Sequence, residues 1–281
     1  MSRIVADLHT HTTFSDGRLD PEALSDCVSS AGLTAFSVTD HDTVAGLPSA
    51  AAAAAARGLE FVPGMEMSTQ TGGVEMHILG YYIDVDHPGI IRYTTDVPER
   101  RRDRAANIVD RLGELGYPIE MSEVNDAAGE GTIGRPHIAQ VLERQGHVST
   151  VGEAFARLIG QDRPAFVPSE KVDTIEAIRL IHDAGGVAVL AHPGQWTRHG
   201  VLLSLIRGGL DGLEVRHPSH AGWLVDYYRG LATDFALVRT GGSDFHGHKH
   251  DEARHIGRFG VSADELAQLR AARDSRKACG A

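Results

Sequence analysis

The sequence predicts an α/β barrel interrupted by an all-helical segment. Short β-rich runs alternate with helical segments along most of the 281 residues, and this alternation is typical of parallel strands buried on both faces. About seven such units can be counted, close to the eight of a (β/α) barrel. Titratable side chains gather where the apolar runs end, and barrel enzymes assemble their sites at the carboxyl ends of their strands.

The individual strands and helices follow from local composition. Each expected strand is a short run rich in apolar and β-branched residues, bounded by turn-forming residues. These strands are residues 3–9, 34–41, 59–68, 74–84, 185–193, 210–218 and 235–244. The helices expected between them are residues 21–30, 45–57, 174–184, 199–208 and 220–234. The second of these helices contains a run of alanines, the residue that favours helix most strongly.

The alternation stops between the fourth and fifth strands. A charged amphipathic helix is expected from Glu99, and two further helical segments follow it, separated by glycines. No β-rich run interrupts them. The sequence therefore predicts a discontinuous barrel domain of residues 1–98 and 170–281, with a helical insertion of residues 99–169 that caps the barrel mouth.

Composition and charge narrow the class of protein. Hydrophobic residues make up 42% of the chain, which is enough for a sizeable core. The formal net charge of -11 disfavours nonspecific attraction to nucleic acid or anionic membranes, so any polyanionic substrate would have to be captured locally. Two cysteines, no signal-peptide pattern and no apolar run of about 18 residues indicate a reduced, cytoplasmic protein.

The strongest local signal is the HTH motif at the end of the first strand. Side chains alternate across a strand, so His9 and His11 point to the same side, with Asp7 behind them. Two converging imidazoles suit a transition-metal ion, and a nearby carboxylate can orient a ring through its other nitrogen. Asp16 follows in a turn. Taken alone, the motif is explained equally well by two surface histidines.

Further strand ends carry the same kinds of side chain. They are Asp40, His41 and Asp42 after the second strand, Glu66 in the third, His77 in the fourth, His192 after the fifth, Glu214 and His217 in the sixth, and Asp244 and His246 after the last. Taken singly, His77 or His192 is better explained as a core histidine with a hydrogen-bond partner, because an unpaired buried imidazole is costly. Together, the clusters at successive strand ends predict a site for several metal ions.

The motifs HTHTTFSDG, TDHD, AHP and GSDFH, with the strand that ends at Glu66, resemble the PHP (polymerase and histidinol phosphatase) family of the amidohydrolase superfamily. The resemblance covers essentially the whole chain. It implies a distorted (β/α)7 barrel that holds up to three divalent metal ions.

Matched motif by motif, the resemblance also implies which residues are metal ligands. The first metal would be held by His9, His11, Glu66 and Asp244, the second by Glu66, His77 and His192, and the third by Asp16, His41 and His246. None of these positions is substituted, which disfavours a degenerate module without metal. Asp40 matches a position that more often lies behind the ligands.

The types of ligand indicate which metal ions can bind and which reaction they can support. Histidine and carboxylate ligands without cysteine accept Mn, Fe or Zn, and we expect two to three divalent ions, with Mn favoured. Such ions lower the pKa of a bound water enough to supply hydroxide near neutral pH, and they neutralise phosphoryl oxygens. No covalent nucleophile is required. Glu66, Asp244 and His217 are the expected catalytic residues.

Phosphate binding needs fixed cations or N–H donors beyond the metals. Arg135 in the motif GRPHIA and Lys171 in FVPSEK lie at the junctions of the insertion, although most Arg and Lys residues are ordinary surface charges. These two motifs and EVRHPSH resemble a PHP subgroup that acts on 3′,5′-nucleotide bisphosphates and on the 5′ ends of short RNA. The resemblance makes Arg135, Lys171 and His217 the expected substrate contacts.

The expected activity is hydrolysis of the 3′-phosphate of a nucleoside 3′,5′-bisphosphate. Alternative enzymes are a 5′–3′ exoribonuclease on short oligonucleotides, a C–N hydrolase, and a histidinol-phosphate phosphatase, which would not explain GRPHIA. A different class of protein, a non-catalytic PHP interaction module, is disfavoured by the complete ligand set. The expected partner is a small nucleotide or a short oligoribonucleotide, and neither long nucleic acid nor a membrane.

Overall fold

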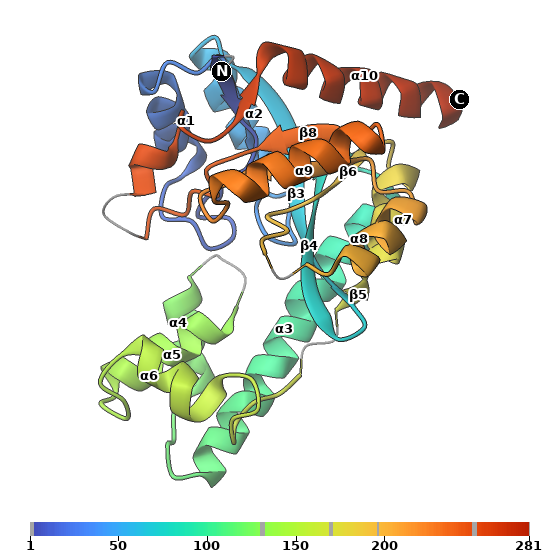
Figure 1. Cartoon of the computed structure of the whole chain (residues 1–281). Helices are drawn as coiled ribbons and strands as arrows, with labels where there is room; N and C mark the ends of the chain where they lie inside the picture. Colours follow the sequence, from blue (N-terminus) through green and yellow to red (C-terminus); the bar gives the residue numbers. More distant parts are fainter. Residues whose placement is uncertain (1–2, 130–132, 169–170, 196, 249–251, 281) are drawn as a thin grey trace. The chain divides into compact units, whose positions relative to one another are not determined.

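The computed structural model describes residues 3–129, 133–168, 171–195, 197–248 and 252–280. The chain divides into two compact units (Figure 1), of which the first is Met1–Arg92 with Lys171–Ala281 and the second is Tyr93–Glu170. We call them the barrel unit and the insertion unit. Among the described residues, no helix is both long and apolar enough to cross a membrane.

One mixed sheet forms the centre of the barrel unit. Its strands are β1 (Ile4–Asp7), β2 (Ala35–Val38), β3 (Glu60–Thr71), β4 (Val74–Tyr81), β5 (Val172–Asp173), β6 (Val187–Leu190), β7 (Gly212–Arg216), β8 (Val238–Gly241) and β9 (Val261–Ser262). They lie in the order β8-β7-β6-β4-β3-β2-β1-β9, with β5 paired to β3. The sheet curls into a nearly closed barrel, which confirms the predicted fold class.

Not every strand is parallel, as the alternating pattern suggested. β4 pairs antiparallel with both β3 and β6, and β9 pairs antiparallel with β1. Only Gly72 and Gly73 separate β3 from β4, and both have positive φ, 57° and 81°. A two-residue connection can join only antiparallel strands, and glycine is favoured where both turn residues need positive φ. The parallel expectation was wrong here because no helix separates the two runs.

Helices cover the outside of the sheet. They are α1 (Pro21–Ser30), α2 (Leu47–Ala56), α7 (Thr174–Asp183), α8 (His199–Arg207), α9 (Gly222–Asp234) and α10 (Ala263–Gly280), with a 3-10 turn η2 at Glu252–His255. The alanine run of α2 turns Ala50 and Ala54 inward, where both are fully buried among Leu24, Val28 and Phe36. Inside the sheet, side chains such as Leu8, Tyr81 and Val189 fill the interior and are fully buried.

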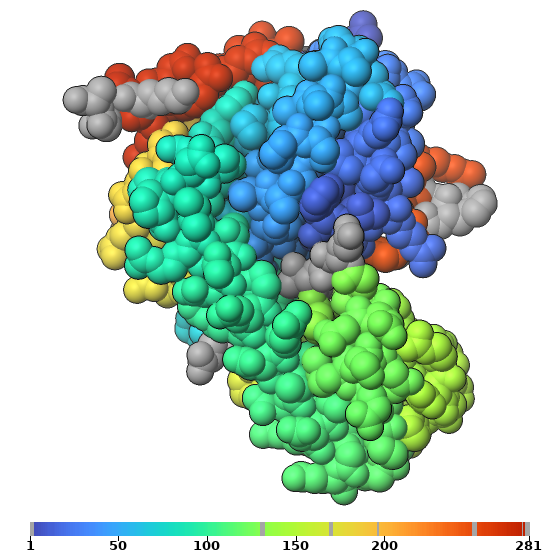
Figure 2. All heavy atoms as spheres, turned by 180° about the vertical axis from the view of Figure 1, so that it is seen from behind, coloured from blue at the N-terminus to red at the C-terminus, as the bar shows by residue number. Residues whose placement is uncertain are grey.

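The insertion unit has a hydrophobic core of its own. Its helices are α3 (Pro88–Glu114, shared with the barrel unit), α4 (Met121–Ala128), α5 (Arg135–Arg144) and α6 (Val151–Ala154), with a π-helical turn η1 at Phe155–Ile159. Ile108, Leu112 and Val141 are almost completely buried among them, and in the space-filling view the insertion forms a compact body (Figure 2). That it caps the barrel mouth stays a prediction.

The first insertion helix starts earlier than the sequence indicated. We expected it from Glu99, where the charged amphipathic pattern begins. Instead α3 begins at Pro88 and continues through Pro98. The division between the two units therefore lies inside a continuous helix, between Arg92 and Tyr93.

Candidate metal centre

Three groups of His and carboxylate side chains lie at the strand ends of the barrel unit. They are His9, His11, Glu66 and Asp244; His11, Asp16, His41 and His246; and His41, Glu66 and His77. In each group, one potential ligand atom from every residue lies within 4.8 Å of the others. Any two groups share a residue. The three groups therefore form one continuous centre.

Barrel closure brings the first and last motifs together. β1 and β8 lie far apart in the strand order, but Thr10 forms a parallel bridge with Phe245. His11 N donates to Phe245 O at 2.9 Å, and Asp244 N donates to His9 O at 2.9 Å. Two motifs more than 230 residues apart in the chain thus form one wall of the centre.

Glu66 lies at the middle of the centre and is fully buried. Its Oε2 atom is 3.0 Å from His9 Nε2, 3.2 Å from His11 Nε2 and 3.3 Å from His41 Nδ1. Its Oε1 atom is 2.7 Å from His77 Nδ1 and 3.0 Å from His192 Nε2. The two oxygens of one carboxylate therefore face two different sets of histidines.

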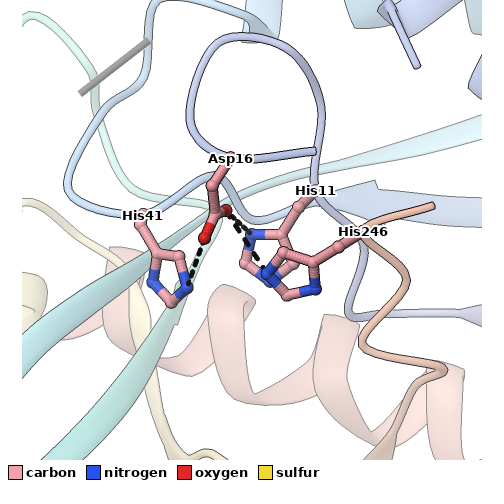
Figure 3. Close-up of side chains that lie close together, drawn as sticks. All are labelled: His11, Asp16, His41 and His246. Atoms are coloured by element: carbon pink, nitrogen blue, oxygen red, sulfur yellow. Dashed lines mark ion pairs between the residues drawn. The ribbon is translucent and has the colours of Figure 1, made fainter. Parts of the chain in front are cut away.

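Asp16 and three histidines form the outer group (Figure 3). Asp16 Oδ1 is 3.3 Å from His246 Nε2, and Asp16 Oδ2 is 4.0 Å from His41 Nε2. The turn that carries Asp16 packs against the HTH segment, since a Cβ on Gly17 would lie 2.5 Å from His11 O. Asp40 lies behind this turn and belongs to none of the three groups. It accepts from Thr12 N and Ser15 Oγ at 2.7 and 2.6 Å.

The electrostatics of the centre fit bound cations. Burial alone would lower the pKa of His11, but the Asp244 and Glu66 carboxylates raise it to about 10. Burial also opposes protonation of His77, yet Glu66 and Glu75 raise its pKa to about 9. Without metal, these buried carboxylates are compensated by protons on the histidines, and metal binding would displace those protons.

Several ring nitrogens of the described histidines in this centre also lack a hydrogen-bond partner. Among the described residues, His11 Nδ1, His11 Nε2 and His41 Nδ1 are buried without a hydrogen bond of acceptable geometry. Carboxylate oxygens lie 3.2 to 3.3 Å from two of them, but not in hydrogen-bonding directions. Burial lowers the pKa of His41 to about 4, which keeps its ring neutral and its lone pair available. The donor set therefore fits divalent metal.

The carboxylate that orients His9 is Glu214. Its oxygens lie 3.1 and 3.3 Å from His9 Nδ1, and Oε2 also accepts from the backbone N–H of His192 at 2.7 Å. Asp7, which the sequence places behind the HTH motif, contacts backbone instead, accepting from Ser243 N at 2.9 Å and from His9 N at 3.3 Å. Sequence reasoning noted Glu214 at its strand end but assigned it no role, because 205 positions separate it from His9.

We expect Glu214→Gln to weaken metal binding by about 10- to 100-fold, the usual effect of losing an outer carboxylate behind a ligating histidine. Gln keeps the shape of Glu214 but cannot offer His9 a charged acceptor. Competition with a chelator measures the affinity. Glu265→Gln is the matched control, since Glu265 is a buried carboxylate bonded to Arg216 rather than to a histidine. Equal metal affinity in Glu214→Gln and wild type would contradict this role.

His217 and His192 lie against the three groups without belonging to them. His217 Nδ1 accepts from Ser219 N at 3.1 Å, and its Nε2 is 3.2 Å from Asp244 Oδ2. A neutral His217 therefore carries its proton on Nε2. His192 has a φ of 25°, and His220 and Tyr228 hold its loop through the N–H and C=O of Gly194.

The two expected phosphate-binding cations lie in different surroundings. Lys171 belongs to the barrel unit and forms an ion pair with Glu75, which also contacts His77 Nε2 at 3.3 Å. Arg135 begins α5 in the insertion unit, where its guanidinium is 5.7 Å from the ring centroids of both Phe155 and Phe166. Their roles as substrate contacts remain proposals.

Comparisons with known proteins agree with this geometry. The PHP domain family matches residues 7–109. The 5′-3′ exoribonuclease of Haemophilus influenzae is 37% identical over 249 residues, which cover 85% of this chain and 89% of that protein. The 3′,5′-nucleoside bisphosphate phosphatase of Chromobacterium violaceum is 31% identical over 253 residues, covering 85% and 86%.

A solved structure extends the likeness to the whole fold. A candidate metal-dependent phosphoesterase from Bifidobacterium adolescentis has a TM-score of 0.85 and 31% identity, with 96% of both chains covered. The chain belongs to the PHP family, as its motifs predicted. With its His and carboxylate groups, it is a metal-dependent phosphoesterase, and therefore a hydrolase.

Proposed function

We propose that the His and carboxylate side chains of this centre hold two or three divalent ions, with Mn favoured. His9, His11, Glu66 and Asp244 would bind the first, Glu66, His77 and His192 the second, and Asp16, His41 and His246 the third. The arrangement of Glu66 supports this proposal, because its two oxygens face separate sets of histidines. His192 is included because its Nε2 atom lies 3.0 Å from Glu66 Oε1.

The bound ions would polarise the phosphoryl oxygens and activate a water for attack on phosphorus. The protein's own part is to place the surrounding groups. Glu214 holds the ring of His9, and Asp7 ties the backbone of β1 to the segment after β8. The Nε2–H of His217 points toward Asp244. From this position, His217 would donate that proton in a hydrogen bond to a phosphoryl oxygen or to the leaving oxygen. We assign the catalytic roles to Glu66, Asp244 and His217.

The substrate we propose is a nucleoside 3′,5′-bisphosphate, which loses its 3′-phosphate. The observation that carries this proposal is the complete centre in a chain whose relatives include a 3′,5′-nucleoside bisphosphate phosphatase and a 5′-3′ exoribonuclease. Removing a 5′-terminal nucleotide as its 5′-monophosphate breaks the same bond, between the 3′-oxygen and phosphorus. The leaving group in both reactions is a nucleoside 5′-monophosphate, and only the other substituent on phosphorus differs, a free phosphate or the rest of the RNA. One site could therefore accept both substrates.

We expect the Mn-loaded protein to release phosphate from adenosine 3′,5′-bisphosphate much faster than from adenosine 5′-monophosphate or histidinol phosphate. Binding of the 5′-phosphate away from the metals would assist reaction at the 3′ end. Phosphate release measured for the three substrates at equal concentration tests this expectation. Equal rates on the first two, or a preference for histidinol phosphate, would refute the proposed substrate.

The second candidate is 5′–3′ exoribonuclease activity on short oligonucleotides. Its support is the 37% identity with the Haemophilus influenzae protein. The net charge of -11 disfavours long RNA, but a short 5′ end can still bind locally. Nucleoside 5′-monophosphates released from a 5′-phosphorylated trinucleotide would show this activity, and comparing kcat/KM with that for the bisphosphate would rank the two.

Lys171 and Arg135 are the further substrate contacts we propose. Lys171 would contact the reacting phosphate, because its partner Glu75 touches His77 beside Glu66. Arg135 would bind either the reacting or the remote phosphate. Its support is the GRPHIA motif and the two aromatic rings that flank its guanidinium.

A further inference from the structure

Arg18 lies at the outer edge of the metal centre. Two residues after Asp16, its backbone N–H donates to His246 O at 2.8 Å. A Cβ on Gly247 would lie 3.4 Å from Arg18 Cβ, so the two loops pack closely. Asp16 and His246, which these loops carry, both belong to the outer group of candidate ligands. The position of Arg18 is thus tied to the centre through two loops.

His248 holds the Arg18 side chain. Arg18 Nε lies 3.1 Å from His248 Nδ1, and His248 Nε2 lies 2.6 Å from Asp16 O. A guanidinium N–H can only donate, so His248 Nδ1 accepts, and the ring proton on Nε2 donates to Asp16 O. His248 therefore links Asp16 O to the guanidinium and fixes one edge of it. Within the described part of the chain, the two Nη groups of Arg18 have no hydrogen-bond partner.

Among the described residues, the charge of Arg18 is also uncompensated. Lys171 is paired with Glu75, and Arg216 is paired with Glu265 through two bonds of 2.7 and 2.9 Å. Arg18 has no carboxylate within ion-pair distance among the described residues, because the Asp16 oxygens face His11, His41 and His246. In a chain of net charge -11, an oriented cation of this kind can capture an anion locally.

We propose that Arg18, oriented by His248, binds the phosphate of the substrate that does not react. The ring of His248 stacks on that of His246 with centroids 6.1 Å apart, so Arg18 lies beyond the outer group and not among its ligands. A planar guanidinium whose two Nη groups have no partner among the described residues suits two oxygens of one phosphate. The inference rests on the proposed function, in which this group is the 5′-phosphate of a nucleotide.

The variant Arg18→Gln tests the proposal in the Mn-loaded protein. We expect KM for adenosine 3′,5′-bisphosphate to rise by about 10- to 100-fold, the effect of losing a hydrogen bond to a charged group. KM for adenosine 3′-monophosphate, which lacks the remote phosphate, should not change. Metal content should equal that of the wild type. Arg207→Gln is the control, since Arg207 is an exposed arginine at the end of α8, just before β7 begins.

Calorimetric binding of adenosine 5′-monophosphate separates this inference from the proposed function. This product keeps only the 5′-phosphate, and its binding does not require turnover. Weaker binding to Arg18→Gln than to wild type supports the site, even if the bisphosphate is not cleaved. Equal binding to both proteins, or an equal rise of KM with and without the 5′-phosphate, would overturn it. His248→Ala should give a smaller change in the same direction, because His248 only orients the guanidinium.

Discussion

Removing divalent metal should abolish phosphate release, and Mn2+ should restore it. The centre gathers Glu66, Glu214 and Asp244 with several buried histidines, and we propose that metal compensates their charge. When the metal is removed, protons take its place: the carboxylates raise the pKa of His11 to about 10 and that of His77 to about 9 against the effect of burial. These two proposed ligands are therefore protonated at neutral pH in the apoprotein.

The same pKa values give the direction of the pH dependence. Metal binds the neutral imidazole, so every ligating histidine that is protonated must lose its proton on binding. Mn2+ affinity should therefore rise as pH rises from 7 toward 9, and binding should release protons. Calorimetry of Mn2+ binding in two buffers of different ionisation enthalpy measures that release. Full activity in metal-free protein, or an affinity that falls with pH over this range, would contradict the proposed centre.

The parts of the centre that lie within one short motif could be predicted from the sequence, whereas contacts between distant motifs could not be predicted from local patterns. HTH and GSDFH each follow a short apolar strand, so the sequence alone places their side chains at strand ends. The contact between them depends on barrel closure through Thr10 and Phe245, which no local pattern shows. The resemblance to the PHP family supplied that connection, and the structure brings the same side chains together.

Other features depend on long-range contacts that the motifs do not contain. Glu214 contacts His9 across 205 positions, and His248 contacts Arg18 across 230. The start of α3 was misplaced for a local reason, because proline is unfavourable inside a helix and Pro98 nevertheless lies in the interior of α3. The antiparallel β4 could have been predicted from Gly72 and Gly73, which leave no room for a crossover between the strands.

Glu66→Gln should lower kcat/KM by more than about 100-fold, and by more than any other single substitution in the centre. Loss of a metal ligand should reduce activity more than loss of the carboxylate behind a ligating histidine, which costs about 10- to 100-fold. Gln preserves the size of Glu66 but removes the charge that two metals would share. Five histidines lie within 3.3 Å of its two oxygens, and its side chain is fully buried.

Asp16→Asn is the matched comparison for Glu66→Gln. Asp16 belongs only to the outer group, its side chain is 41% exposed, and its contacts with His11 and His41 are 4.0 Å long. We expect this variant to lose at most the third metal and to retain more activity. Metal content by mass spectrometry, kcat/KM and thermal unfolding of both variants make the comparison, with unfolding showing that each remains folded. A larger loss in Asp16→Asn, or full metal content in Glu66→Gln, would show that Glu66 does not bridge two ions.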